Sequence, residues 1–193
     1  MQAVLDLGPL TRQTADLAAA VRDEQLGGPT PCPDYDVRAL LGHIRGLTTA
    51  FADAGRKRLG PTTDTSPQAE LPDPGADWRE RLPAELAALA EVWRDPEAWT
   101  GMTRAGGVDL PGEVAGLVAV DELVIHGWDL AVATGQAYAP DPAALDAAME
   151  FLRQSTEPED REGIFGPVVE PKPGAEALER AVALSGRDPG WRP

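Results

Sequence analysis

Three carboxylates and a histidine interrupt a long apolar stretch of the chain, residues 114–133. If this stretch is a helix, Glu122 lies one turn before His126 on the same face, and Asp129 lies almost one turn after it. A buried carboxylate and a buried imidazole are costly unless a partner satisfies them. A divalent metal suits both groups, because each donates a lone pair when it is deprotonated. The spacing therefore indicates a metal site whose missing ligand comes from another part of the chain.

The other histidine of the chain, which has two, is His43. It follows Asp34 and Asp36, either of which can cap a helix, and it lies among apolar residues at helical spacing: Val37, Leu40, Leu41, Ile44 and Leu47. His43 therefore belongs to the inward face of this predicted helix. Together with Glu122 and His126 it gives two imidazoles and one carboxylate, a set that leaves coordination positions open, as catalytic zinc sites do. The same set suits nickel or iron. The alternative for His43 is a core histidine with a backbone partner.

Helices are the elements that must position these residues. Apolar periodicity and stop signals predict them over about 9–26, 36–58, 78–94, 111–134, 142–155 and 175–184. Residues 60–76 are rich in Pro, Thr, Ser and Asp and are expected to form a long loop, a candidate lid over the site; residues 100–110 are expected to form a turn or an irregular strand pair. We expect an all-α protein, a four-helix bundle with short additional helices. We also expect a single domain over residues 1–193, with residues 156–193 packed on the bundle as a tail.

The formal net charge of -15 limits the partners that the chain can have. It argues against nucleic acid and against anionic membrane surfaces, both of which attract basic patches. We find no apolar run of membrane-spanning length and no signal-peptide pattern in the first residues. The single cysteine, Cys32, excludes an internal disulfide and a multi-cysteine metal site. The hydrophobic content of 42% is typical of an ordinary globular protein. Together these features predict a protein of the cytoplasm.

Three residues near the expected ligands have two interpretations each. Asp129 either orients His126 or an arginine, or belongs to a charged surface. Asp121 points roughly 100° away from Glu122 on a helix, which predicts that it faces solvent or bonds to Arg45 or another helix. Trp128 is expected in the core or in the wall of a pocket rather than as a residue that reads a ligand.

Cys32, Arg38 and Arg45 are weaker candidates for a role in chemistry. Cys32 lies between two prolines and resembles a nucleophile, but free cysteines are usually buried small apolar residues, and no histidine is left to activate it if both bind metal. Arg38 and Arg45 could bind an anionic substrate, whereas arginines on helix surfaces are normally only solvated.

Two long motifs and the end of the chain resemble one known family. The motifs are residues 30–43, TPCPDYDVRALLGH, and residues 122–136, ELVIHGWDLAVATGQ; the closing residues 184–189 read LSGRDP. They resemble the N-terminal domain of mycothiol-dependent maleylpyruvate isomerases, in particular a large actinobacterial branch of that family. The resemblance implies a DinB/YfiT-like four-helix bundle that binds a metal through His43, Glu122 and His126. It further implies that the metal is zinc, with water completing its coordination.

The resemblance also implies a function. In the isomerase and in related transferases the metal is thought to bind a low-molecular-weight thiol, here mycothiol, as a thiolate that attacks a small electrophile. The isomerase has an additional C-terminal domain that contributes to its active site, and we expect this chain to be too short to contain one. Alternatives are a non-catalytic metal- or small-ligand-binding bundle, monomeric or homodimeric, and a hydrolase in which the metal activates water.

Overall fold

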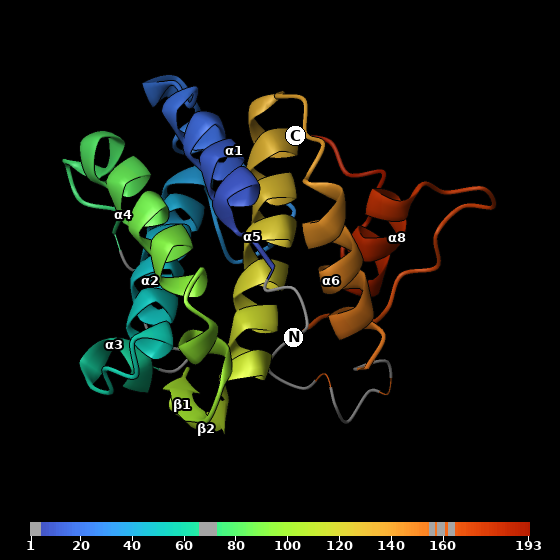
Figure 1. Ribbon diagram of the computed structural model, residues 1–193. Helices are drawn as coiled ribbons and strands as arrows, with labels where there is room; N and C mark the ends of the chain where they lie inside the picture. Colours follow the sequence, from blue (N-terminus) through green and yellow to red (C-terminus); the bar gives the residue numbers. More distant parts are fainter. Residues whose placement is uncertain (1–4, 66–72, 155–156, 158–160, 162–164) are drawn as a thin grey trace.

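Four helices form the bundle that the sequence predicts (Figure 1). They are α1 (Gly8–Ala19), α2 (Val37–Gly55), α4 (Trp78–Trp93) and α5 (Gly112–Thr134). The computed structural model describes residues 5–65, 73–154, 157, 161 and 165–193. Within them the only sheet is a two-stranded hairpin, so the prediction of an all-α fold is confirmed.

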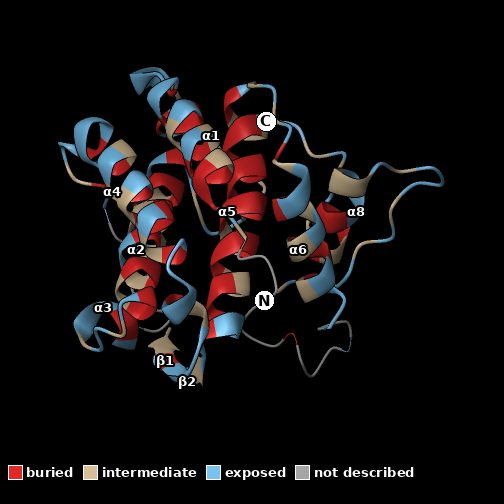
Figure 2. Cartoon of the chain, viewed as in Figure 1, coloured by how far each residue is buried: buried red, intermediate tan, exposed pale blue. Residues whose placement is uncertain are grey.

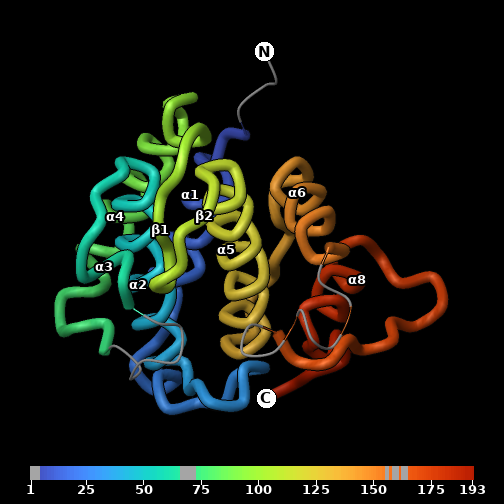
Figure 3. Tube along the Cα trace, turned by 90° about the horizontal axis from the view of Figure 1, so that it is seen from below, coloured from blue at the N-terminus to red at the C-terminus, as the bar shows by residue number. Residues whose placement is uncertain are grey.

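Helix α5 occupies the centre of the molecule. It packs against α1 and α2 on one side and against α6 (Pro142–Leu152) and α8 (Ala177–Leu184) on the other, as Figures 1 and 3 show. Helix α4 closes the bundle by packing on α1 and α2. Because α5 is covered from two sides, it is buried around almost its whole circumference (Figure 2). The largest fully buried side chains of the bundle are Leu10, Leu40, Leu41, Ile44, Leu82, Leu86, Leu89, Trp93 and Leu130.

The residues that begin and end the helices act as their types predict. The side chain of Asp36 accepts a hydrogen bond of 2.7 Å from the backbone N–H of Ala39 and caps α2. Asp141 caps α6 in the same way. Gly135 ends α5 with a φ of 70°, in the left-handed region that glycine tolerates best. Pro111 is the last residue of a strand and immediately precedes α5, rather than lying in its first turn.

The structure corrects several predicted boundaries. The first helix ends at Ala19 and a separate 3-10 turn follows over Asp23–Gln25, while α2 ends at Gly55 rather than near residue 58. The expected loop over residues 60–76 begins with a short helix, α3 (Pro61–Asp64), because Pro61 is preorganised for a first helical turn. Residues 66–72 lie outside the described part of the chain, so a lid there stays a prediction.

Two short connecting elements lie between α4 and α5. A 3-10 helix, η2 (Pro96–Trp99), is followed by the antiparallel strands β1 (Met102–Ala105) and β2 (Val108–Pro111). The turn between the strands contains Gly106 and Gly107, both with positive φ. Where we expected a turn or an irregular strand pair, over residues 100–110, the structure has a regular hairpin.

The C-terminal segment lies against the side of α5 that the bundle leaves open (Figure 3). Helix α8 contacts α6 and α5, and the backbone N–H of Val169 donates to the carbonyl of Ala183. The buried guanidinium of Arg161 donates to the carbonyls of Gly166 and Leu184. That the whole chain forms one domain stays a prediction. Among the described residues, no helix is long and apolar enough to cross a membrane.

We predict that Gly116→Ala lowers the free energy of unfolding by about 1–2 kcal/mol, because overpacking a tight core is costly. A Cβ at Gly116 would lie 2.8 Å from the Trp93 ring and 2.5 Å from the Trp99 ring, two rings whose centroids are 5.0 Å apart. The measurement is chemical denaturation. The control is Gly27→Ala, where a Cβ would meet no atom within 4 Å. A Gly116→Ala variant as stable as the parent would show that α5 is not fixed by this contact.

Candidate metal centre

Helices α2 and α5 bring His43, Glu122 and His126 together. The two helices pack side by side, and Leu40 and Ile44, close to His43 on α2, are fully buried. His43 therefore reaches the stripe of α5 that carries Glu122 and His126, as the helical spacing predicts. One ligand atom from each residue lies within 4.8 Å of the other two.

The donor atoms converge on one point. Nε2 of His126 lies 3.0 Å from Oε2 of Glu122, and Nε2 of His43 lies 3.8 Å from the same oxygen. The two imidazole rings meet edge to face, with centroids 4.7 Å apart. Ligands that share one zinc ion are separated from each other by roughly 3–4 Å, given zinc–ligand distances near 2 Å. The three residues thus fit a divalent metal with small movements of their side chains.

Asp129, which is also on α5, contacts the other nitrogen of the His126 ring, Nδ1. Its Oδ2 lies 2.9 Å from Nδ1 of His126. Its carboxylate is fully buried and also accepts hydrogen bonds from Nε of Arg187, at 2.8 and 2.9 Å to its two oxygens. Of the two interpretations open from the sequence, the structure shows the contact with His126 and an arginine. A carboxylate in this place fixes which ring nitrogen carries the proton and leaves Nε2 free to bind metal.

The surroundings shift the pKa of each expected ligand. Burial alone would raise the pKa of Glu122, but its close contacts with His126 and His43 outweigh this effect and hold that pKa below its usual range. Burial likewise opposes the charged form of His126, yet the hydrogen bond to Asp129 and the close contact with Glu122 raise its pKa to about 9. Burial lowers the pKa of His43. Without metal, the raised pKa favours the positively charged form of His126, which lies between two carboxylates. A metal cation at this site would balance the same negative charges.

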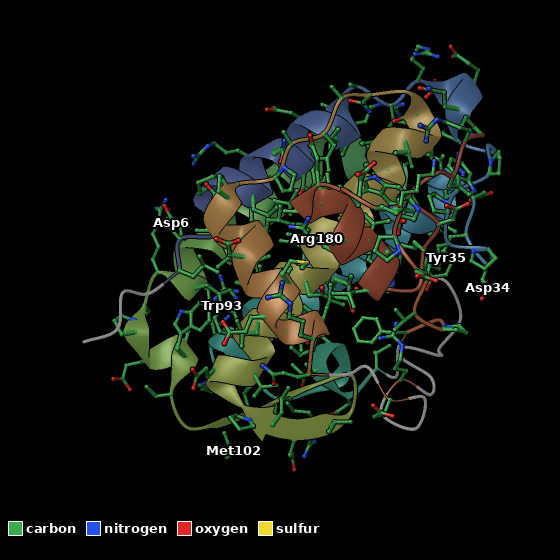
Figure 4. All side chains as sticks on the ribbon, turned by 90° about the vertical axis from the view of Figure 1, so that its right-hand side faces the viewer. Asp6, Asp34, Tyr35, Trp93, Met102 and Arg180 are labelled. Atoms are coloured by element: carbon green, nitrogen blue, oxygen red, sulfur yellow. The ribbon has the colours of Figure 1, made fainter. Side chains whose placement is uncertain are left out.

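Residues 30–35, which lead into α2, lie beside the cluster. The ring of Tyr35, labelled in Figure 4, has its centroid 5.1 Å from that of His43. The hydroxyl of Thr30 donates to the carbonyls of Cys32 and Tyr35 and fixes this segment. Burial raises the pKa of the half-buried Cys32 thiol, which favours the thiol over the nucleophilic thiolate. Trp128 is buried in the interior.

The expectation that Asp121 faces solvent or bonds to Arg45 is wrong. Its side chain is only 3% exposed and does not reach Arg45, and among the described residues no group forms a hydrogen bond with its Oδ1. The prediction failed because α6 and the C-terminal segment cover the face of α5 that the bundle leaves free. Burial, and then the neighbouring Glu122, raise the pKa of Asp121 well above its ordinary value.

Arg38 and Arg45 form ion pairs with carboxylates other than Glu122. Arg45 donates to Glu85 on α4 at 2.9 and 3.0 Å and to Asp77 at 3.2 Å. Arg38 lies 3.7 Å from Asp73 in a largely exposed pair. Their described contacts are therefore those of surface and interhelical ion pairs.

Sequence reasoning missed Arg187 as a member of the site. The closing motif at residues 184–189 contains it, but 58 positions separate it from Asp129, and no periodicity relates the two. The one available signal was an arginine in a motif next to a glycine, Gly186, and the structure gives this glycine a positive φ of 88°.

A protein-family model described as the mycothiol maleylpyruvate isomerase N-terminal domain matches residues 7–131. The chain belongs to this family. The matched residues include His43, Glu122, His126 and Asp129, whereas Arg187 lies outside the match. The recognition made from the sequence motifs is thereby confirmed.

Two proteins of Mycobacterium tuberculosis are similar to this family member over most of its length. They are the uncharacterized protein MT0763 of strain CDC 1551 / Oshkosh and the uncharacterized protein Rv0738 of strain H37Rv. Each is 30% identical over 162 residues, which cover 82% of this chain and 81% of the relative. No solved structure matches the chain significantly.

We predict that Asp129→Ala, assayed in excess chelator, lowers the free energy of unfolding by about 3 kcal/mol, because it leaves Arg187 largely buried without its carboxylate. The double variant Asp129→Ala/Arg187→Met removes both charges and should regain part of that loss. Urea denaturation measures both, with Asp146→Ala on the exposed face of α6 as the control. Equal stability of Asp129→Ala and the control would show that the ion pair does not stabilise the fold.

Proposed function

We propose that this protein is a divalent-metal-dependent bundle enzyme of the mycothiol type, with His43, Glu122 and His126 as its metal ligands and zinc as its metal. The observation that carries the proposal is the convergence, within 4.8 Å, of three donor atoms from two helices that lie far apart in the sequence. Membership of a family named for a mycothiol-dependent isomerase supports the choice of thiol.

The exposure of the ligands favours an open site over a closed structural one. The Glu122 side chain is 28% exposed and that of His43 is 17% exposed, although His126 and Asp129 behind them are buried. Three protein ligands with one accessible side are typical of catalytic zinc sites, whereas structural zinc sites use four protein ligands. A small molecule can therefore approach the donor atoms from the side of Glu122 and His43.

The residues of this chain have separate tasks in the proposed reaction. A divalent metal bound here would supply Lewis acidity that lowers the pKa of a thiol and makes thiolate available at neutral pH. His43 and His126 present their Nε2 atoms, Glu122 supplies the anionic donor, and Asp129 keeps the proton of His126 on Nδ1.

The proposed substrates are mycothiol and a small electrophile. The sulfur lone pair of the thiolate forms a bond to the electrophilic carbon, and the electron pair of the bond that breaks departs with a leaving group or moves to a neighbouring atom. The thiol proton passes to solvent. Transfer, addition and thiol-assisted isomerisation all begin with this step.

We predict that the purified, untagged protein contains about one divalent metal per chain, as a mononuclear site requires. His43→Ala and His126→Ala should lose it and stay folded, because apolar burial supplies most of the stability of the bundle. Elemental analysis measures the metal and circular dichroism measures the fold. Glu113→Ala, on the exposed first turn of α5, is the matched control. Full metal content in His126→Ala would refute the ligand assignment.

We further predict that the metal-loaded protein accelerates the reaction of mycothiol with 1-chloro-2,4-dinitrobenzene, in which a C–S bond forms and chloride leaves. The absorbance of the thioether product gives the rate. His126→Ala should reduce the acceleration to the background rate, while Glu113→Ala should retain it. If the protein binds metal but accelerates neither this reaction nor that of other low-molecular-weight thiols, the enzyme proposal fails and a binding role remains.

A further inference from the structure

The side chain of Arg187 connects the C-terminal segment to the candidate metal centre. The backbone N–H of Arg187 donates to the carbonyl of Val182, which closes the turn after α8. Nε of Arg187 then lies 2.8 and 2.9 Å from the two oxygens of Asp129, and the Arg187 side chain is only 15% exposed. The second oxygen of Asp129 also contacts Nδ1 of His126. Three residues from two distant parts of the chain thus form one continuous buried chain of contacts.

The Asp129 carboxylate could not keep this position alone. It is fully buried on a helix that is covered from both sides, and an unpaired buried carboxylate is strongly destabilising. Arginine compensates its charge, and the single Nε–H bridges both oxygens and so restricts rotation of the carboxylate. Weaker contacts of 3.3 and 3.4 Å to Ser185 hold the other end of the guanidinium.

We propose that Arg187 is a positioning residue of the metal centre, which fixes the Asp129 carboxylate so that it holds the proton of His126 on Nδ1 and aims Nε2 at the metal. This inference rests on the proposed metal site. It assigns to the C-terminal segment a part of the site that lies outside the residues matched by the family model, 7–131. The segment after α8 then has a task beyond covering α5.

The expected effect is on metal affinity, because an outer partner of a histidine ligand sets the orientation of the ring. Arg187→Met should weaken zinc binding by about 10–100-fold, the range usual for such partners. Arg187→Lys keeps the charge but not the planar guanidinium, and should restore part of the affinity. The control is Arg180→Met, which removes an exposed arginine of α8, labelled in Figure 4.

Competition with a chromophoric chelator gives the zinc Kd of the full-length protein and each variant. A double-variant cycle with Asp129→Asn separates positioning from general loss of stability. If Arg187 acts through Asp129, then Arg187→Met should change the Kd far less in the Asp129→Asn background than in the parent. Equal effects in both backgrounds, or an unchanged Kd in Arg187→Met, would overturn the inference.

Histidine-specific ¹⁵N NMR supplies a readout that stability alone does not move, and the spectrum is simple because the chain has two histidines. The zinc-loaded parent should show His126 protonated at Nδ1 and metal-bound at Nε2, and Arg187→Met should lose the protected Nδ1–H signal. An unchanged signal in Arg187→Met would also overturn the inference. The two proposals fail separately: a parent that binds no zinc refutes the metal site itself, whereas a parent that binds zinc and is unaffected by Arg187→Met refutes only the role of Arg187.

Discussion

The contact between Glu122 and His126 on a helix that is buried from both sides is the constraint on which the rest of the structure depends. An apolar environment penalises both groups, and their mutual contact involves only one polar atom of each. The remaining polar atoms must also find partners. His43 from α2 supplies one, and Asp129 with Arg187 behind it supplies the other. Helix α5 can therefore lie at the centre of the molecule only because α2 and the C-terminal segment lie on either side of it.

The charges around this contact are divided into two groups. Asp129 and Arg187 neutralise each other in the interior, at hydrogen-bond distance and away from solvent. Glu122, which is partly exposed, is the anion that faces the two Nε2 atoms. In the proposed function, a divalent cation at that point would meet one carboxylate and two neutral imidazoles, a donor set that would leave a net positive charge. Such a charge would attract an anionic ligand such as the proposed thiolate.

Most of the fold, and the proximity of His43, Glu122 and His126, could be predicted because they depend on local patterns. Helical spacing places Glu122 and His126 on one face, and the apolar residues around His43 give its face on α2. The burial of Asp121 could not be predicted in this way, since periodicity reveals how polar a face is and not which element will cover it. Arg187 was missed for a related reason. Its contact joins residues 58 positions apart, across a turn whose direction depends on the φ of Gly186.

The arrangement also explains why the proposed ligands and the residues that support them come from different parts of the chain. A bundle of tightly packed helices fixes backbone positions well, so α2 and α5 are suited to hold donor atoms in a narrow range of distances. A carboxylate between His126 and solvent would exchange its hydrogen bonds with water and hold the ring loosely. Covering it with α6, α8 and the turn to Arg187 excludes that water, which strengthens the hydrogen bond to Nδ1. The side of the cluster at Glu122 and His43 stays partly exposed, and under the proposed function it is the direction from which a small molecule would approach.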